Sequence, residues 1–225
     1  MKKWLFLILS LCSTAVASET FYVKNQSEKF DVKIEVAKCE NGLCEGRARF
    51  SLFTKNGRKL FQIFNLSETF ISLNNESQPE TAKIKDEKIS KWSSVYLEDF
   101  NFDGLDDLAI PDGRNGGYGS VSYKIYLYSK QKKKFVFNRY FTKLVQGPYF
   151  GIFEIDYKKK SLETFWKSGA GFHQIERYKI FRNKPIKIYQ YSEDSMINDG
   201  NKNITTKKLI GGKWRSWTKT VKDEN

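Results

Sequence analysis

The residues from Asp99 to Asp107 place oxygen-bearing groups at alternate positions of one short loop. Oxygen ligands in this arrangement suit Ca²⁺, which accepts flexible geometry, better than Mg²⁺, which demands a tight octahedron. Gly104 permits the sharp turn that brings the following backbone around the ion. The complete D-x-N-x-D-G-x-x-D pattern is more specific than a single acidic turn, so it predicts a calcium-binding loop. The expected ligands are the side chains of Asp99, Asn101, Asp103 and Asp107 and the backbone carbonyl of Leu105.

This loop is not expected to belong to an EF-hand pair. Its first half matches an EF-hand loop, but the closing carboxylate stands at the ninth position instead of the twelfth, and no long helical pattern flanks it. The remaining alternative is a turn rich in Asx residues that binds no metal. We expect calcium to brace the structure, because no acid and base for catalysis stand nearby.

A second candidate site is the small-residue loop from Lys167 to Gln174, which lies between two predicted strands. Gly169 lets the backbone approach another surface closely, and Ser168, Phe172 and His173 are expected to project from the tip. Three interpretations remain: a protein-binding tip, a plain hairpin turn with Phe172 in the core, and a catalytic Ser168–His173 pair. The catalytic interpretation is the weakest, because no third group that would orient the histidine is evident.

The stretch from Gly113 to Ser120 is rich in glycine. It lacks the Gly-Lys-Ser/Thr ending and the strand-to-helix setting of a phosphate-binding loop, so phosphate binding is not expected. The sequence instead predicts a mobile loop that presents Tyr118.

The elements that must position these loops are β-strands, because apolar and polar residues alternate with a period of two along most of the chain. The expected strands are 30–36, 47–53, 60–64, 122–128, 134–138, 151–155, 162–166, 174–181 and 186–191, followed by a hairpin over 207–217. Turns are expected at Asn56-Gly57 and at Gly211-Gly212. No long helical period occurs. The pattern predicts a mainly β fold, an antiparallel β-sandwich or a barrel-like domain with a calcium-binding loop.

The domain organisation is expected to be simple. The segment 74–91 is polar and contains Pro79, which indicates a surface connection. Neither side of this segment looks complete by itself, so we expect a single β-rich domain over residues 18–225. Trp214 and Trp217 are expected to pack in the core or at a sheet edge rather than to form a ligand platform.

Residues 1–17 have the features of a cleavable signal peptide: a basic start, a short apolar run, and Ala15 and Ala17 before the cleavage site. A lipoprotein signal ending at Cys12 is less favoured, because Leu11 is bulky where a small residue is expected. The rest of the chain contains no second long apolar run, so no transmembrane segment is expected. These features predict a periplasmic protein.

Cys39 and Cys44 are the two cysteines that remain after removal of the signal peptide. A four-residue segment that contains Asn41-Gly42 separates them, so a disulfide across a β-hairpin is expected in an exported protein. A metal or redox site is less favoured, because a CxxxxC spacing without further partners is not typical of either.

The charge and composition limit the remaining possibilities. The 225 residues include 39 Lys and Arg and 26 Asp and Glu, which gives a formal net charge of +13. Removal of Lys2 and Lys3 with the signal peptide lowers this charge to +11. The excess favours contact with anions. A single His and three Cys exclude most transition-metal sites and weaken the case for a hydrolase triad.

Several motifs of the chain resemble, in the same order, those of a family of exported bacterial calcium-binding proteins. The best-understood branch of that family comprises immunity proteins that neutralise lysozyme-like effectors of a type IV secretion system. The resemblance implies a β-rich fold similar to that of periplasmic inhibitors of invertebrate-type lysozyme. The calcium pattern alone also resembles the FG-GAP repeats of adhesins. The motifs are Asp99–Ile110, Asn115–Gly119, Tyr123–Tyr128, Lys167–Gly169, His173-Gln174 and Tyr178.

The same resemblance implies roles for the second loop, which is similar to the Ser-Gly-x-x-Tyr signature with which lysozyme inhibitors enter an active-site cleft. The residues implied to bind the partner are Tyr118, Ser168, Gly169, Phe172 and His173. The chain departs from the family pattern at two places. Ala170 and Gly171 stand where many relatives have Cys, and Phe172 replaces an indole or a phenol and so cannot donate their hydrogen bond.

The leading hypothesis is therefore a periplasmic inhibitor or immunity protein, without enzyme activity, that blocks a lysozyme-like or other peptidoglycan-cleaving enzyme. The alternative is a module that binds envelope glycans or an anionic surface polymer. A third hypothesis, a glycan hydrolase, requires two opposed carboxylates that sequence spacing cannot establish. Nucleic acid is not an expected partner, because export removes the chain from it. The sequence predicts no oligomeric state.

Overall fold

The computed structural model describes residues 18–24, 26–55, 58–82, 93–196 and 200–223. The predicted signal peptide, Cys12 and the predicted turn at Asn56-Gly57 lie outside these ranges. Within them the chain is mostly β, with antiparallel strands in three sheets and a few short helical turns. No helix in the described ranges is long and apolar enough to cross a membrane.

The N-terminal sheet has the order β1-β2-β3-β4, with β5 also paired to β3. In β2, every second residue from Phe30 to Val36 is buried, because the apolar side chains point to one face of the strand. This confirms the strand predicted from alternation. The strands are β1 (Glu19–Val23), β2 (Phe30–Glu40), β3 (Leu43–Thr54), β4 (Leu60–Leu66) and β5 (Phe70–Ser72).

The middle sheet has the order β6-β7-β8-β9. All five residues of β7 are buried, so both faces of this strand are covered. A strand buried on both faces shows no alternation, which is why the sequence did not predict it. The strands are β6 (Tyr96–Glu98), β7 (Asp107–Pro111), β8 (Tyr123–Ser129) and β9 (Lys134–Phe137).

The C-terminal sheet is a meander in which each strand pairs with the next one along the chain, from β10 to β15. Its β14–β15 hairpin turns at Gly211-Gly212, where φ is 57° and 76°. This confirms the predicted Gly-Gly turn. The strands are β10 (Glu154–Asp156), β11 (Ser161–Ser168), β12 (Phe172–Phe181), β13 (Lys184–Asp194), β14 (Asn201–Ile210) and β15 (Lys213–Lys222).

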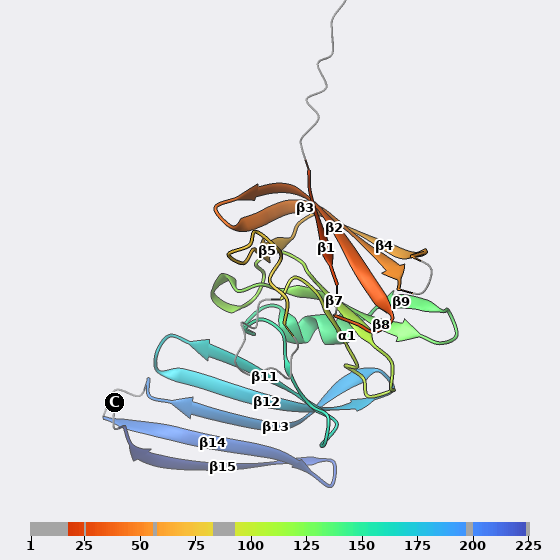
Figure 1. The fold of residues 1–225 in the computed structure, drawn as a ribbon. Coiled ribbons are helices and arrows are strands. Elements are labelled where there is room, and N and C mark those ends of the chain that lie inside the picture. The colour runs from red at the N-terminus through yellow and green to blue at the C-terminus, as the bar shows by residue number, and fades with distance from the viewer. Residues whose placement is uncertain (1–17, 25, 56–57, 83–92, 197–199, 224–225) are drawn as a thin grey trace, which may run out of the picture.

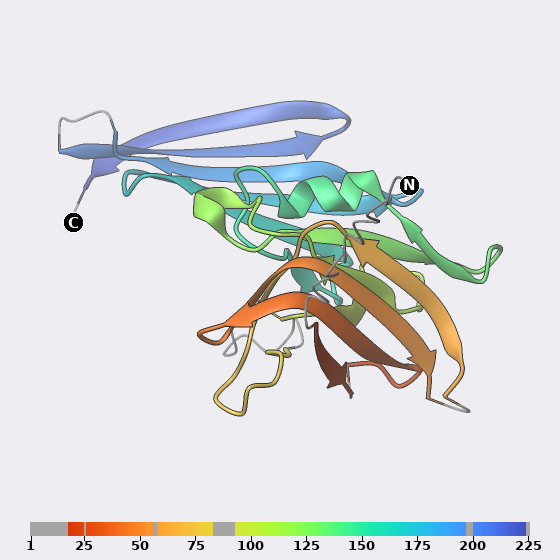
Figure 2. The same cartoon turned by 90° about the horizontal axis from the view of Figure 1, so that it is seen from above.

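The three sheets lie one above another, with the middle sheet between the other two (Figure 1, Figure 2). Leu108 and Ile110 of β7 pack with the buried side chains of the N-terminal sheet. Ala109, between them, points to the opposite cluster, which includes Leu162 and Tyr178 of the C-terminal sheet. One continuous sandwich-like domain results, and its core joins residues from both sides of the predicted connection at 74–91.

The described residues also contain three short helical segments: η1 (Gly117–Gly119), α1 (Arg139–Thr142) and η2 (Lys143–Val145). The side chain of Asn138 caps α1 by accepting hydrogen bonds from the backbone N–H groups of Tyr140 and Phe141, at 3.0 and 3.2 Å. Phe141 is fully buried under the middle sheet. The sequence showed no long helical period, and these segments are only three or four residues long.

Cys39 and Cys44 form a disulfide, and they stand directly opposite each other in the β2–β3 hairpin with a Cα–Cα distance of 4.0 Å. The turn between these strands contains Asn41 and Gly42, both with positive φ. The predicted disulfide across a hairpin is therefore confirmed. Of the two positions expected for Trp214 and Trp217, the core and a sheet edge, the structure shows the edge: they are 46% and 51% exposed on β15.

Candidate functional site

The hairpin of β11 and β12 ends in an exposed tip. Its last pair is Ser168 with Phe172, so the turn consists of residues 169–171. Gly169 has φ of 62°, which a residue without a Cβ adopts at little cost. Ser168, Gly169 and Ala170 are all exposed. The tip therefore offers a hydroxyl and an unobstructed backbone to an approaching surface.

Tyr118 reaches this tip from a distant part of the chain. Its hydroxyl accepts a hydrogen bond from the backbone N–H of Gly169. The tyrosine side chain is 66% exposed and its backbone φ is 52°, in the left-handed region. The structure thus brings together two of the predicted partner-binding residues, although 51 positions separate them in the sequence.

The glycine-rich loop that carries Tyr118 is held closely against residues 147–150. The N–H of Gly117 donates to the carbonyl of Tyr149 at 2.7 Å. A Cβ added at Gly117 would lie 2.4 Å from the carbonyl oxygen of Pro148, and one added at Gly116 would lie 2.3 Å from the hydroxyl of Ser120. These glycines are required for close approach rather than for mobility. The mobile loop predicted from the sequence is instead a packed one.

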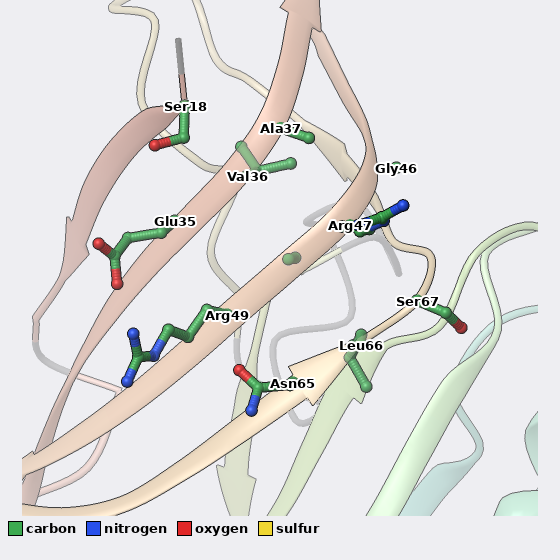
Figure 3. Close-up of a pocket in the computed structure, with 11 residues that line it drawn as sticks. Ser18, Glu35, Val36, Ala37, Gly46, Arg47, Arg49, Asn65, Leu66 and Ser67 are labelled. Atoms are coloured by element: carbon green, nitrogen blue, oxygen red, sulfur yellow. The ribbon is translucent and has the colours of Figure 1, made fainter. Parts of the chain in front are cut away.

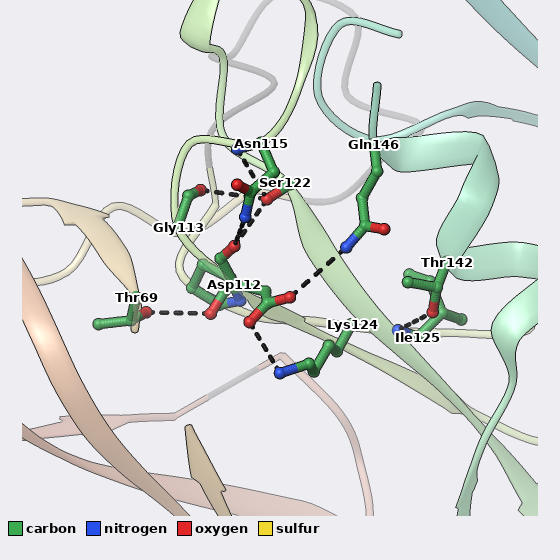
Figure 4. Close-up of polar contacts among 10 residues, drawn as sticks. Thr69, Asp112, Gly113, Asn115, Ser122, Lys124, Ile125, Thr142 and Gln146 are labelled. Atoms are coloured by element: carbon green, nitrogen blue, oxygen red, sulfur yellow. Dashed lines mark hydrogen bonds and ion pairs between the residues drawn. The ribbon is translucent and has the colours of Figure 1, made fainter. Parts of the chain in front are cut away.

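Asp112 and Ser122 fasten the base of the same loop (Figure 4). The Ser122 hydroxyl donates to the carbonyl of Asp112 at 2.7 Å and accepts from the N–H of Asn115 at 3.1 Å. The Asp112 carboxylate forms an ion pair with Lys124 at 2.8 Å and accepts a longer hydrogen bond from Gln146 at 3.4 Å. The loop is therefore anchored to β8 and to the segment that follows η2.

A row of aromatic rings runs from Tyr118 along one face of the hairpin. Successive ring centroids lie 5.6 Å apart between Tyr118 and Phe150, 5.9 Å between Phe150 and Phe165, and 6.0 Å between Phe165 and His173. The ammonium of Lys167 lies 5.7 Å from the ring centre of Tyr118 and 5.8 Å from that of Phe150. This aromatic row is a partly exposed surface with one cation above it.

Phe172 and His173, both predicted to contact the partner, point to opposite faces of the hairpin. Phe172 pairs with Ser168, whereas His173 pairs with Lys167, and successive residues of a strand alternate between faces. Phe172 is half-buried against Trp166, with ring centroids 4.9 Å apart. His173 instead ends the aromatic row. Ser168 and His173 therefore form no nucleophile–base pair, which removes the catalytic interpretation of these two residues.

A polar cluster under the hairpin was not predicted from the sequence. The Glu176 carboxylate, only 4% exposed, accepts hydrogen bonds from the Tyr149 hydroxyl at 2.9 Å, from Gln174 at 2.8 Å and from Tyr178. Lys187 forms an ion pair with it at 2.8 Å. Burial acts to raise the pKa of Glu176, but the hydrogen bonds outweigh it and hold the pKa below its ordinary value.

This cluster ties the segment that contains Tyr149 and Phe150 to the inner face of β12. Its only sequence signal is the polar alternation of Gln174 and Glu176 at positions where β12 faces the core. Because Phe150 belongs to the aromatic row, the buried cluster also fixes the row from behind.

The acidic loop from Asp99 to Asp107 is held by hydrogen bonds from its own backbone N–H groups and from one of β8. Asp99 accepts from the N–H groups of Asp103 at 3.0 Å and Gly104 at 2.8 Å. Asp107 is fully buried and accepts from the N–H groups of Phe100 at 3.0 Å and Tyr128 at 2.8 Å. The turn therefore has the Asx-rich hydrogen bonding of the alternative that the sequence left open.

The donor chemistry of this loop fits a hard cation. Burial raises the pKa of Asp107 to about 8, and the negative charges of Asp103 and Asp99 add to the rise. A divalent cation would offset this repulsion. Within the described ranges, however, acidic, His and Cys side chains form no group of three or more at metal-binding distance. Calcium binding with the carbonyl of Leu105 as a fifth ligand stays a prediction.

The acidic loop also contacts the C-terminal sheet. The side-chain amide of Asn101 donates to Asp103 at 3.2 Å and to the side-chain oxygen of Asn183 at 3.1 Å. Asn183 lies in the β12–β13 turn, where its φ is 58°. The loop and the hairpin tip thus lie at opposite ends of β12.

A shallow groove of 770 Å³ lies on the N-terminal sheet, away from the predicted site residues (Figure 3). Glu35, Arg47 and Arg49 contribute its charged side chains. Glu35 also forms an ion pair with Lys33 at 2.9 Å. The groove contains none of the residues predicted to bind calcium or a partner.

Comparison with known proteins gives one informative result for the fold. No protein-family model matches the sequence, and no curated protein matches it. A solved structure described as a Xanthomonas type IV secretion system related protein is 18% identical in sequence and superposes with a TM-score of 0.70. The match covers 91% of this chain and 94% of that one. The chain therefore shares its overall fold with a protein related to a type IV secretion system.

Proposed function

We propose that this chain is an exported inhibitor or immunity protein whose β11–β12 tip enters the cleft of a peptidoglycan-cleaving, lysozyme-like enzyme. The observation that carries the proposal is the hydrogen bond from Gly169 to the Tyr118 hydroxyl, which holds an otherwise exposed tip in one shape. A tip ordered before binding loses less conformational entropy when it docks. The fold similarity to a protein related to a type IV secretion system is compatible with this role.

The proposed mechanism is steric. Ser168 donates its hydroxyl to a catalytic carboxylate of the target, and Gly169 leaves room for the two backbones to approach. His173 and Tyr118, at the two ends of the aromatic row, contact the rim of the cleft. Phe172 supports the tip from the other face, through its contact with Trp166. The proposal assigns no catalysis to this chain.

Calcium has a bracing role in this proposal. Asp99, Asn101, Asp103 and Asp107 hold the ion in the loop that contacts the β12–β13 turn through Asn183. The bound charge offsets the repulsion among the carboxylates and steadies the end of β12 that lies away from the tip. The proposed location is the periplasm, which agrees with the disulfide between Cys39 and Cys44.

The test uses a double variant, Ser168→Arg with Gly169→Val. It is expected to abolish inhibition of a lysozyme-like enzyme captured from envelope extract in the presence of calcium, while far-UV circular dichroism stays unchanged. Gln131→Trp is the matched control, because it adds bulk to an exposed turn of a different hairpin. Full inhibition by the double variant would refute the proposed tip.

A second candidate function is binding of an envelope glycan or an anionic surface polymer, which the aromatic row and Lys167 favour. Aromatic faces stack on sugar rings, and the cation adds attraction for anionic groups. This function predicts retention on purified cell wall that weakens as salt increases. An inhibitor instead binds one enzyme in a one-to-one ratio.

A further inference from the structure

The β14–β15 hairpin forms an exposed edge of the molecule. β15 is ten residues long and lies at the end of the C-terminal sheet, where β14 is its only neighbour among the described strands (Figure 1). Every residue from Lys213 to Thr220 is exposed, so both faces of this strand are open. A two-stranded ribbon with two open faces is only marginally stable by itself.

The edge is also regular. All ten residue pairs from Asn201 with Lys222 to Ile210 with Lys213 are in continuous register, whereas the β12–β13 ladder contains a shift at Arg177 and Tyr178. Proteins usually protect sheet edges with short strands, bulges or a covering segment. β15 is long and pairs without a bulge, and no other strand in the described ranges pairs with its outer edge, so the protection that these ranges show is its positive charge.

Most of the charge lies on one face of β15, which carries three of its four basic residues. Lys213, Arg215, Trp217 and Lys219 occupy alternate positions and share a face, and Trp214, Ser216, Thr218, Thr220 and Lys222 share the other. The whole hairpin from Asn201 to Lys222 contains seven basic residues and no acidic one. In a partner strand that pairs with β15, every second side chain would therefore lie next to the row formed by three cations and the indole of Trp217.

We propose that β15 is a docking edge for an extended acidic segment of a partner protein, which adds as the seventh strand of the C-terminal sheet. Acidic residues of that segment lie beside Lys213, Arg215 and Lys219, and its β-branched residues lie beside the threonines. A second copy of this chain does not fit, because antiparallel pairing of two β15 strands would bring their cations together. This edge is separate from the β11–β12 tip and does not depend on the inhibitor role.

The hairpin geometry identifies which backbone groups are open. In a hairpin with a two-residue turn, the closing pair, here Ile210 and Lys213, exchanges both hydrogen bonds, and the next pair exchanges none. Counting on from this pair, Trp214, Ser216, Thr218 and Thr220 direct their N–H and C=O groups away from β14. Proline at Ser216 would therefore remove an outward N–H without breaking a bond to β14.

The experiment measures binding of a fluorescent ten-residue peptide that alternates Glu with Val. We expect the full-length protein to bind it and Ser216→Pro to weaken binding at least ten-fold. Ser216→Ala, which also lacks the hydroxyl but keeps the N–H, should bind as the unchanged protein does. Circular dichroism and thermal unfolding of the three proteins establish that the hairpin still forms.

A second peptide separates strand pairing from simple charge attraction. It has the same number of Glu residues, with Pro in place of alternate Val residues, and it cannot pair as a strand. The proposal requires much weaker binding of this peptide. Equal binding of the two peptides, or equal affinity of Ser216→Pro and Ser216→Ala, would overturn it, since either result would leave only electrostatic attraction.

Charge reversal and self-association complete the test. Lys213→Glu with Lys219→Glu should abolish binding of the alternating Glu-Val peptide. In sedimentation of the protein alone, two copies should not associate through β15. A dimer that Ser216→Pro dissociates would overturn the proposal and assign the edge to a second copy of the chain. Failure of these tests would leave inhibition by the β11–β12 tip unaffected, because that activity is measured separately.

Discussion

The substitution Tyr118→Phe tests whether the tip is held in shape before it meets a partner. It removes only the hydroxyl that accepts the N–H of Gly169, and it leaves the ring that contacts Phe150 and Lys167. An uncharged hydrogen bond contributes about 0.5–1.5 kcal/mol net. Because the Tyr118 side chain is 66% exposed, water replaces part of the lost bond, and we expect a cost of about 0.5–1 kcal/mol.

This cost corresponds to a loss of about two- to five-fold in the population of the bound shape of the tip. Inhibition of a captured lysozyme-like enzyme should weaken by the same factor. Amide hydrogen exchange at Gly169 should become faster to a similar extent, and the melting temperature should hardly change, because the tip is not part of the core.

Tyr22→Phe provides the matched control. Tyr22 is 63% exposed on the N-terminal sheet, so the variant removes an equally accessible hydroxyl at a distant place. It should change neither exchange at Gly169 nor inhibition. If Tyr118→Phe leaves exchange at Gly169 unaltered, the hydrogen bond does not order the tip and the reasoning is wrong.

Four further predictions concern the scaffold. Replacement of Cys39 and Cys44 by Ser should lower the free energy of unfolding by about 2 kcal/mol, the low end for a disulfide because the loop is short; urea titration measures this, and an unchanged midpoint would contradict it. Calcium added to metal-stripped protein should raise the melting temperature, and Asp103→Asn should remove this gain. If a calorimetric titration with calcium releases no heat, the predicted calcium site is wrong. In metal-free protein the raised pKa of Asp107, about 8 against an ordinary 3.8, means that the folded state binds more protons than the unfolded state, so stability should fall as pH rises from about 4 to about 8. Asp107→Asn should flatten this slope, as measured by urea unfolding at a series of pH values. Gly117→Ala should destabilise the packed loop by about 1–3 kcal/mol, since the new Cβ would lie 2.4 Å from the Pro148 carbonyl oxygen, and a neutral result would mean that the loop yields easily.

Most of the strands could be predicted from local patterns in the sequence. The alternation of residues 30–36 predicted the core of β2, and the Gly211-Gly212 dipeptide predicted the last turn. The short spacing of Cys39 and Cys44 predicted their disulfide. All of these features involve residues close together in the chain, whose preferences act without the rest of the fold.

Contacts between distant segments could not be predicted in this way. The bond between Tyr118 and Gly169 depends on three segments that meet only in the folded chain. β7 escaped prediction because Leu108 and Ala109 face two different cores, so burial on both sides removed the alternating signal. For Trp217 the sequence left the core and a sheet edge as alternatives, because an indole is typical of both, and only the structure shows that it lies at the edge.

The position of β7 between two cores has a consequence for the order in which the protein comes apart. The β14–β15 hairpin is made of contacts close in sequence, and β15 is exposed on both faces, so we expect it to open and close while the rest stays folded. β7 cannot be released without separating the N-terminal and C-terminal sheets, so its amide groups exchange with solvent only when the whole molecule unfolds. We therefore expect amide exchange to be fast at this edge and slow in β7, and the kinetic lifetime of the fold to depend on β7.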